Sequence, residues 1–161
     1  MISLSGFSVA IIGPIFGAVA DQTGHRKLWL LFFTILCAAT STLLWYIEPN
    51  VHLAIKALIL VGIANFSFEM GMVFYNSMLP TLAEEKDIGL WSGWGWGLGY
   101  FGGLSCLAII LFFFLDPTTS LLELNTDTAE HIRATGPIVA IWMMLFSLPL
   151  FLFTAEENTS L

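Results

Sequence analysis

The sequence predicts an all-α integral membrane protein with five transmembrane helices. Of its 161 residues, 57% are hydrophobic and 11% are charged, and the mean hydropathy is +0.85. A soluble domain carries about 25% charged residues, so this chain has too few polar groups to cover its own surface in water. The chain also contains five long apolar runs, and about 20 apolar residues suffice for a helix to cross the hydrocarbon core.

The first two helices are expected on either side of a charged loop. Residues 1–20 and 28–47 contain no charged side chain, whereas Asp21, Arg26 and Lys27 lie between them. Ionised groups are costly inside hydrocarbon, so these three residues mark where the chain leaves the membrane and returns.

The remaining helices are expected over residues 53–79, 90–115 and 134–154. The last two spans contain no charged residue, and the loop between them begins with Asp-Pro, which stops a helix. The basic residues near the span ends are divided between two sides, with Arg26, Lys27 and Lys86 against Lys56 and Arg133. This excess of positive charge favours a cytoplasmic location for the loop at 20–27.

That loop combines glycines with charged residues. Its sequence from Gly17 to Lys27, GAVADQTGHRK, reads glycine, three residues, aspartate, two residues, glycine and then basic residues. Gly17 allows two helix backbones to approach closely, and Asp21 can accept hydrogen bonds from the start of the next helix. Gly24 permits a tight reversal, after which Arg26 and Lys27 can pair with carboxylates or lipid headgroups.

This pattern between two spans is similar to the loop signature of major facilitator superfamily transporters, which joins their second and third helices on the cytoplasmic side. The resemblance implies a gating contact made by the matching residues Gly17, Asp21, Gly24, Arg26 and Lys27. Gln22 and His25 depart from the signature, in which arginine is usual. The alternative is a positively charged turn without a gating role, and both interpretations stay open.

Three further segments resemble the vacuole-effluxer group of this superfamily, which includes fungal autophagy-related vacuolar amino-acid effluxers and many bacterial permeases. They are VFYNSMLPTLA at 73–83, WSGWGWGLGYFGGL at 91–104 and IVAIWMMLFSLPLF at 138–151. The resemblance implies that residues 1–161 are a partial N-terminal helical bundle, equivalent to helices two to six of a twelve-helix major facilitator fold. On this interpretation the sequence is a fragment.

The same resemblance implies a secondary active transporter that moves a small solute by alternating access, with amino acids as the candidate class. Its bacterial members imply a location in the bacterial inner (cell) membrane. The expected partners are the lipid bilayer, the solute, protons as the coupling ion and the missing helices of the full transporter. Because a transporter's solute site lies between two helix bundles, we expect these 161 residues alone to be inactive.

Polar residues within the third expected helix form a stripe. Asn65 and Asn76 lie within about 40° of Glu69 at 100° per residue. Glu69 lies near the middle of the bilayer, where a carboxyl group must be protonated, paired or hydrated. The stripe is interpreted either as the lining of a solute or proton pathway or as a set of hydrogen bonds between helices.

The fourth expected helix is rich in glycine. One face carries Gly95, Gly99, Gly102 and Gly103, and the opposite face carries Gly93 and Gly97. Small residues on two faces favour close packing between two neighbouring helices. A bending hinge for alternating access is the alternative.

A different class of function is a non-transporting helical membrane module or truncated product that associates with other helices. An enzyme is not expected, because no span contains histidine and no nucleophile–base pair is present. The two cysteines, Cys37 and Cys106, lack the spacing of a metal site, so we expect neither metal nor cofactor. Five scattered basic residues exclude a nucleic-acid footprint.

Overall fold

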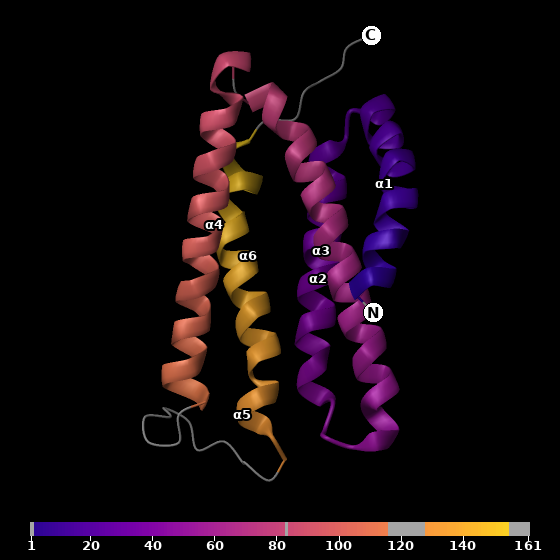
Figure 1. Ribbon diagram of the computed structural model, residues 1–161, viewed down its shortest axis with the longest axis vertical. Helices are drawn as coiled ribbons and strands as arrows, with labels where there is room; N and C mark the ends of the chain where they lie inside the picture. Colours follow the sequence, from indigo (N-terminus) through magenta and orange to yellow (C-terminus); the bar gives the residue numbers. More distant parts are fainter. Residues whose placement is uncertain (1, 83, 116–127, 155–161) are drawn as a thin grey trace.

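The computed structural model describes residues 2–82, 84–115 and 128–154, and its long helices run side by side (Figure 1). The long helices are α1 (Ile2–Thr23), α2 (Arg26–Leu43), α3 (Ala54–Leu82), α4 (Ile88–Ile110) and α6 (Thr135–Phe153). A single helical turn, α5 (Glu130–Arg133), precedes α6. Short 3₁₀ turns at Leu44–Tyr46, Val51–Leu53 and Glu85–Asp87 flank the long helices, and a π-helical turn at Leu111–Leu115 ends α4.

The expected all-α membrane fold is confirmed. Among the described residues, four helical segments are long and apolar enough to cross a membrane: Arg26–Tyr46, Val51–Pro80, Glu85–Phe114 and Glu130–Phe153. The remaining expected span, residues 1–20, corresponds to α1, whose apolar part Gly6–Ala20 is shorter than these four. The helices follow the uncharged runs because a helix is the structure that satisfies its own main-chain hydrogen bonds in hydrocarbon.

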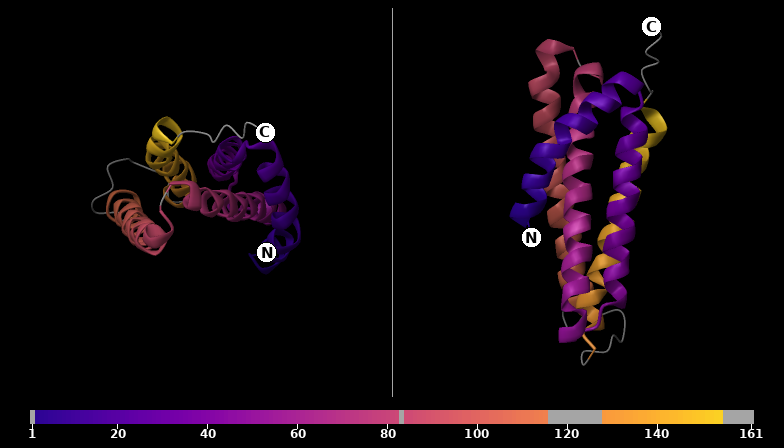
Figure 2. Two further views of the ribbon diagram at one scale, coloured as in Figure 1. Left: turned by 90° about the horizontal axis from the view of Figure 1, so that it is seen from above. Right: turned by 90° about the vertical axis from the view of Figure 1, so that its right-hand side faces the viewer.

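The long helices form two layers. Helices α1, α3 and α4 lie in the front layer of Figure 1, with α3 in the middle, and α2 and α6 lie behind them. The view from above shows the same order (Figure 2). The α1–α2 turn and the α3–α4 connection lie at one end of the bundle, and the α2–α3 connection lies at the other. The side of α3 that carries Val61, Phe68 and Asn76 is exposed.

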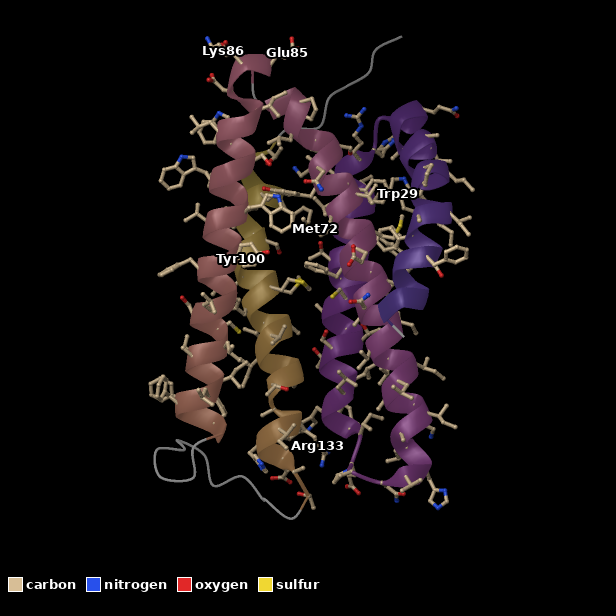
Figure 3. The ribbon with its side chains drawn as sticks, in the orientation of Figure 1. Trp29, Met72, Glu85, Lys86, Tyr100 and Arg133 are labelled. Atoms are coloured by element: carbon tan, nitrogen blue, oxygen red, sulfur yellow. The ribbon has the colours of Figure 1, made fainter. Side chains whose placement is uncertain are left out.

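Aromatic and methionine side chains from α1, α2 and α3 form the packed core. Phe33 and Phe74 are buried, and their rings stack with centroids 5.8 Å apart. Trp29 stacks on Phe74 at 6.2 Å and meets Phe16 of α1 edge-on at 5.3 Å (Figure 3). In lipid the hydrophobic effect between helices is weak, so this close packing of large surfaces is what holds the three helices together.

Helices α2 and α6 are in close main-chain contact at Gly136. A Cβ atom added to Gly136 would overlap the main-chain carbonyl oxygen of Ser41, and the Cβ of Leu44 would lie 3.5 Å away. Gly136 and the nearby Ala140 are both buried. Glycine is required at this position because the obstacle is main chain, which cannot rotate away.

The change Gly136→Ala should separate α2 from α6 and lower the thermal unfolding temperature of the protein in detergent. A core overpacked by one methyl group is destabilised by about 1–3 kcal/mol. Gly102→Ala is the matched control, because a Cβ at Gly102 meets no atom within 4 Å. Equal unfolding temperatures for the two variants would contradict the close contact.

Candidate functional site

The predicted polar stripe lies on one side of α3. Glu69 and Asn65 are partly exposed and Asn76 is exposed, whereas Met70 and Phe74 are turned toward the core and buried. Helix α3 thus has a buried side and an open side, and the three residues of the stripe lie on the open side. Whether the stripe carries solute or protons stays a prediction.

Contacts to α1 and α4 locate the open side. Val73 Cγ2 lies 3.8 Å from the position of a Cβ on Gly13 of α1. On the other flank, the hydroxyl of Tyr75 lies 3.1 Å from the position of a Cβ on Gly95 of α4. Glu69 and its stripe therefore lie between the line of contact with α1 and the line of contact with α4, on the open face of α3.

The chemistry of this face centres on Glu69. Within the part of the chain that the structure describes, the Glu69 carboxyl forms no hydrogen bond or ion pair. A carboxyl group in mid-span without a protein partner can exchange a proton, or bind a cation, wherever water or a solute reaches it. The amide groups of Asn65 and Asn76 supply both donors and acceptors on the same face.

The glycines of α4 differ in their surroundings. Gly95 is the position at which Tyr75 of α3 approaches, and an alanine there would press against the tyrosine hydroxyl. A Cβ added at the other glycines of this segment would meet no atom within 4 Å; they are Gly93, Gly97, Gly99, Gly102 and Gly103. Tyr100 on the same helix is 68% exposed (Figure 3). Most glycines of α4 thus face open space, and the packing role predicted for them stays untested.

The loop residues that match the transporter signature lie at the α1–α2 turn. Gly24 has φ 67°, a left-handed conformation that glycine adopts without steric cost, and it reverses the chain. Gly17 lies on α1 with open space around it. Asp21 belongs to α1, but its side chain lies outside the described residues, so its expected hydrogen bonds to the start of α2 stay a prediction.

The two cations of the loop bind main-chain carbonyl groups. Arg26 Nη1 donates to the carbonyl oxygen of Ser77 on α3 at 3.0 Å, and Lys27 Nζ donates to the carbonyl oxygen of Thr154 after α6. Glu84, a carboxylate on the same side, pairs instead with Lys86 at 2.8 Å, and both side chains are largely exposed. Arg26 and Lys27 therefore join the start of α2 to the ends of two other helices.

Arg133, at the opposite end of the bundle, was not identified from the sequence as a bridging residue (Figure 3). Its Nε donates to the carbonyl oxygen of Trp45 at 2.6 Å, and its guanidinium lies 5.4 Å from the centre of the Trp45 ring. The acceptor is a main-chain group that every residue carries, so the sequence contains no signal for this pairing.

Comparison with known proteins places the chain in a family. Residues 1–91 match the family described as vacuole effluxer Atg22 like. The chain belongs to this family. It is 30% identical over 149 residues to an uncharacterized MFS-type transporter, YxiO, of Bacillus subtilis, which covers 92% of this chain and 34% of that protein. The resemblance inferred from the sequence is confirmed.

Two further relatives match the chain over shorter stretches. The chain is 32% identical over 83 residues to autophagy-related protein 22-1 of Aspergillus fumigatus, covering 52% of this chain and 13% of that protein. It is 33% identical over 113 residues to an uncharacterized protein of Aquifex aeolicus, and the match covers 70% of this chain and 26% of that protein. The chain thus spans about a third or less of these relatives, and no solved structure matches it. It is a multi-pass membrane protein of a transporter family.

The change Arg26→Met should lower the free energy of unfolding by about 1.5–3 kcal/mol, the usual contribution of a hydrogen bond to a charged group. Thermal unfolding in detergent measures the effect. Lys86→Met is the control, because an exposed ion pair contributes about 0–1 kcal/mol. A smaller loss for Arg26→Met than for Lys86→Met would mean that the bond to Ser77 does not stabilise the bundle.

Proposed function

We propose that this chain supplies five transmembrane helices to a secondary active transporter, which moves a small solute by alternating access. The observation that carries the proposal is the position of Asn65, Glu69 and Asn76 on the open face of α3, between α1 and α4. Membership of the Atg22-like family and the similarity to an MFS-type transporter support it. The bacterial relatives favour the bacterial inner membrane as its location.

Amino acids are the solute class that we propose. The Glu69 carboxylate complements the ammonium group of an amino acid, and the amides of Asn65 and Asn76 can donate to its carboxylate. When solute is absent, Glu69 can take up a proton, so that proton and solute alternate at one group. This chemistry requires no cofactor, no metal and no covalent step, so we propose a transporter rather than an enzyme.

The solute site of such a transporter lies between two helix bundles. The chain provides one bundle and spans 34% of the MFS-type relative. We therefore propose that it works together with the other helices of a full transporter and does not transport alone. In that assembly the residues from Gly17 to Lys27 would act as the gating loop on the cytoplasmic side.

The open glycine positions on α4 support a second candidate function. Gly93, Gly97, Gly99 and Gly103 leave room for another helix backbone to pack closely against α4. A membrane module that associates with other helices and does not transport would use this surface in the same way. The two functions differ in whether the stripe on α3 is reached by water.

Water should reach a cysteine placed at Asn76. In a background with Cys37→Ala and Cys106→Ala, Asn76→Cys should react with a membrane-impermeant maleimide in cells or proteoliposomes. Leu148→Cys is the matched control. Leu148 is 46% exposed on the outer side of α6, and it lies near the same end of the bundle as Asn76. Equal lack of reaction at both positions would favour the helix-association module.

Transport should depend on the Glu69 carboxyl. In the full transporter that contains these helices, Glu69→Gln should reduce uptake or efflux of a radiolabelled amino-acid mixture by at least about tenfold, as expected when a polar contact worth about 1.4 kcal/mol or more is lost. It should also remove the dependence on a proton gradient. Glu48→Gln, a change at an exposed carboxylate outside the spans, should leave transport unchanged. Unchanged, proton-coupled transport by Glu69→Gln would exclude the proposed role.

A further inference from the structure

Two cations lie close to the starts of α2 and α6, Lys27 inside the first turn of α2 and Arg133 two residues before α6. Lys27 is the second residue of α2, and Arg133 ends the helical turn that leads into α6. The start of a helix carries a partial positive charge, so a cation there is repelled by its own helix. Lys27 therefore requires compensation from another part of the molecule, whereas Arg133 ends α5, where a cation is favoured.

The compensation comes from the neighbouring antiparallel helix. Lys27 Nζ donates to the carbonyl oxygen of Thr154, the residue that follows α6. Arg133 Nε donates to the carbonyl oxygen of Trp45, in the 3₁₀ turn that ends α2. The last carbonyl groups of a helix lack main-chain donors and carry its partial negative charge. Each cation thus meets the negative end of the other helix.

The two hydrogen bonds are reciprocal. At one end of the pair α2 donates to α6, and at the other end α6 and its leading turn donate to α2. Between the two ends, the main chains are in close contact at Gly136 and Ser41, and the small residues Ala38 and Ala140 are buried. Sliding one helix along the other, or opening the pair at either end, would break at least one of these bonds.

We propose that Lys27 and Arg133 form a reciprocal clasp that makes α2 and α6 one rigid unit in the back layer of the bundle. Because its hydrogen bonds lie at both ends of the pair, the clasp prevents α2 and α6 from sliding along each other. Because the glycine contact lies between these bonds, the distance between the two helices is also fixed. Helix α4 has no comparable anchor in the described residues: its glycines mostly face open space. The rigid unit is then a fixed support against which α4 can shift.

The clasp is a property of the bundle and does not depend on the proposed transport function. Its acceptors are main-chain atoms, so it should tolerate a change of the Thr154 side chain. Its donors are side chains, so it should fail when either cation is removed. This difference between donor and acceptor substitutions distinguishes the clasp from general packing at the helix ends.

Spin labels at the two ends of the α2–α6 pair test the clasp. In the protein reconstituted in lipid, with Cys37→Ala and Cys106→Ala, one label pair is Leu28→Cys with Leu152→Cys, near Lys27. The other pair is Tyr46→Cys with Ile132→Cys, near Arg133. All four positions are exposed, so the labels do not disturb the core. Dipolar broadening of the EPR spectrum reports the separation at each end.

Lys27→Met should increase the separation of the first label pair and so abolish its dipolar broadening. Arg133→Met should have the same effect on the second pair, and the double variant should affect both pairs. Two controls should retain it. Thr154→Ala keeps the main-chain acceptor, and Lys56→Met removes an exposed cation that has no hydrogen bond or ion pair within the described residues. If the methionine variants retain the broadening as Lys56→Met does, the clasp is excluded.

If a methionine variant does not fold and accumulate in the membrane, the corresponding glutamine variant is measured in its place. Lys27→Gln and Arg133→Gln keep a neutral donor, so they should fold and should lose part of the broadening at the corresponding end. Lys27→Arg keeps both charge and donor and should retain it. Full broadening in the glutamine variants would overturn the proposal, and loss of broadening in Lys27→Arg would do the same.

Discussion

Main-chain carbonyl groups in or beside the last two turns of helices are the acceptors on which the arrangement of this bundle depends. A carbonyl oxygen has two lone pairs and can accept a bond from a side chain, and the chain has few cations that could donate one. Arg26, Lys27 and Arg133 donate to the carbonyl groups of Ser77, Thr154 and Trp45 respectively. Three of the five Lys and Arg residues of the chain are therefore used to connect helices. Because two of the three bonds start from consecutive residues, the start of α2 is the point at which α3 and α6 are both attached.

Packing between these attachment points follows a second constraint. Lipid tails are as apolar as leucine, so helices associate where their surfaces fit more closely than lipid does. The bundle meets this requirement in two ways. Large stacked rings such as Phe33 and Phe74 fill the space among α1, α2 and α3. Between α2 and α6, small residues such as Gly136 bring the main chains together. Over most of its length, helix α4 is packed neither by stacked aromatic rings nor by a close main-chain contact.

The positions of the helices could be predicted from the sequence, because bilayer thickness fixes the length of an apolar run. The face of α3 that carries Glu69 also follows from helical periodicity alone. The partners of Arg26 and Lys27 could not be predicted as readily, since side-chain carboxylates such as Glu84 are visible in a sequence and main-chain acceptors are not. The role of Gly136 was equally hidden: the glycines of α4 mostly face open space, whereas a Cβ at Gly136 would overlap the main chain of α2.

The two layers of the bundle thus have different physical characters. The back layer, α2 and α6, is joined at both ends, with the Gly136 contact close to the Arg133 end. Its groove, lined by apolar residues such as Ile35 and Leu145, suits contact with lipid. The front layer carries the polar stripe on α3 and the open glycines of α4. Alternating access requires a site whose surroundings move while its framework keeps its shape. A clasped back layer provides the framework, and a loosely packed α4 beside a mid-membrane carboxyl provides the part that can move. In the transporter that we propose, the few charges of the chain would be divided between two tasks: Lys27 and Arg133 hold helices together, and Glu69 meets the solute.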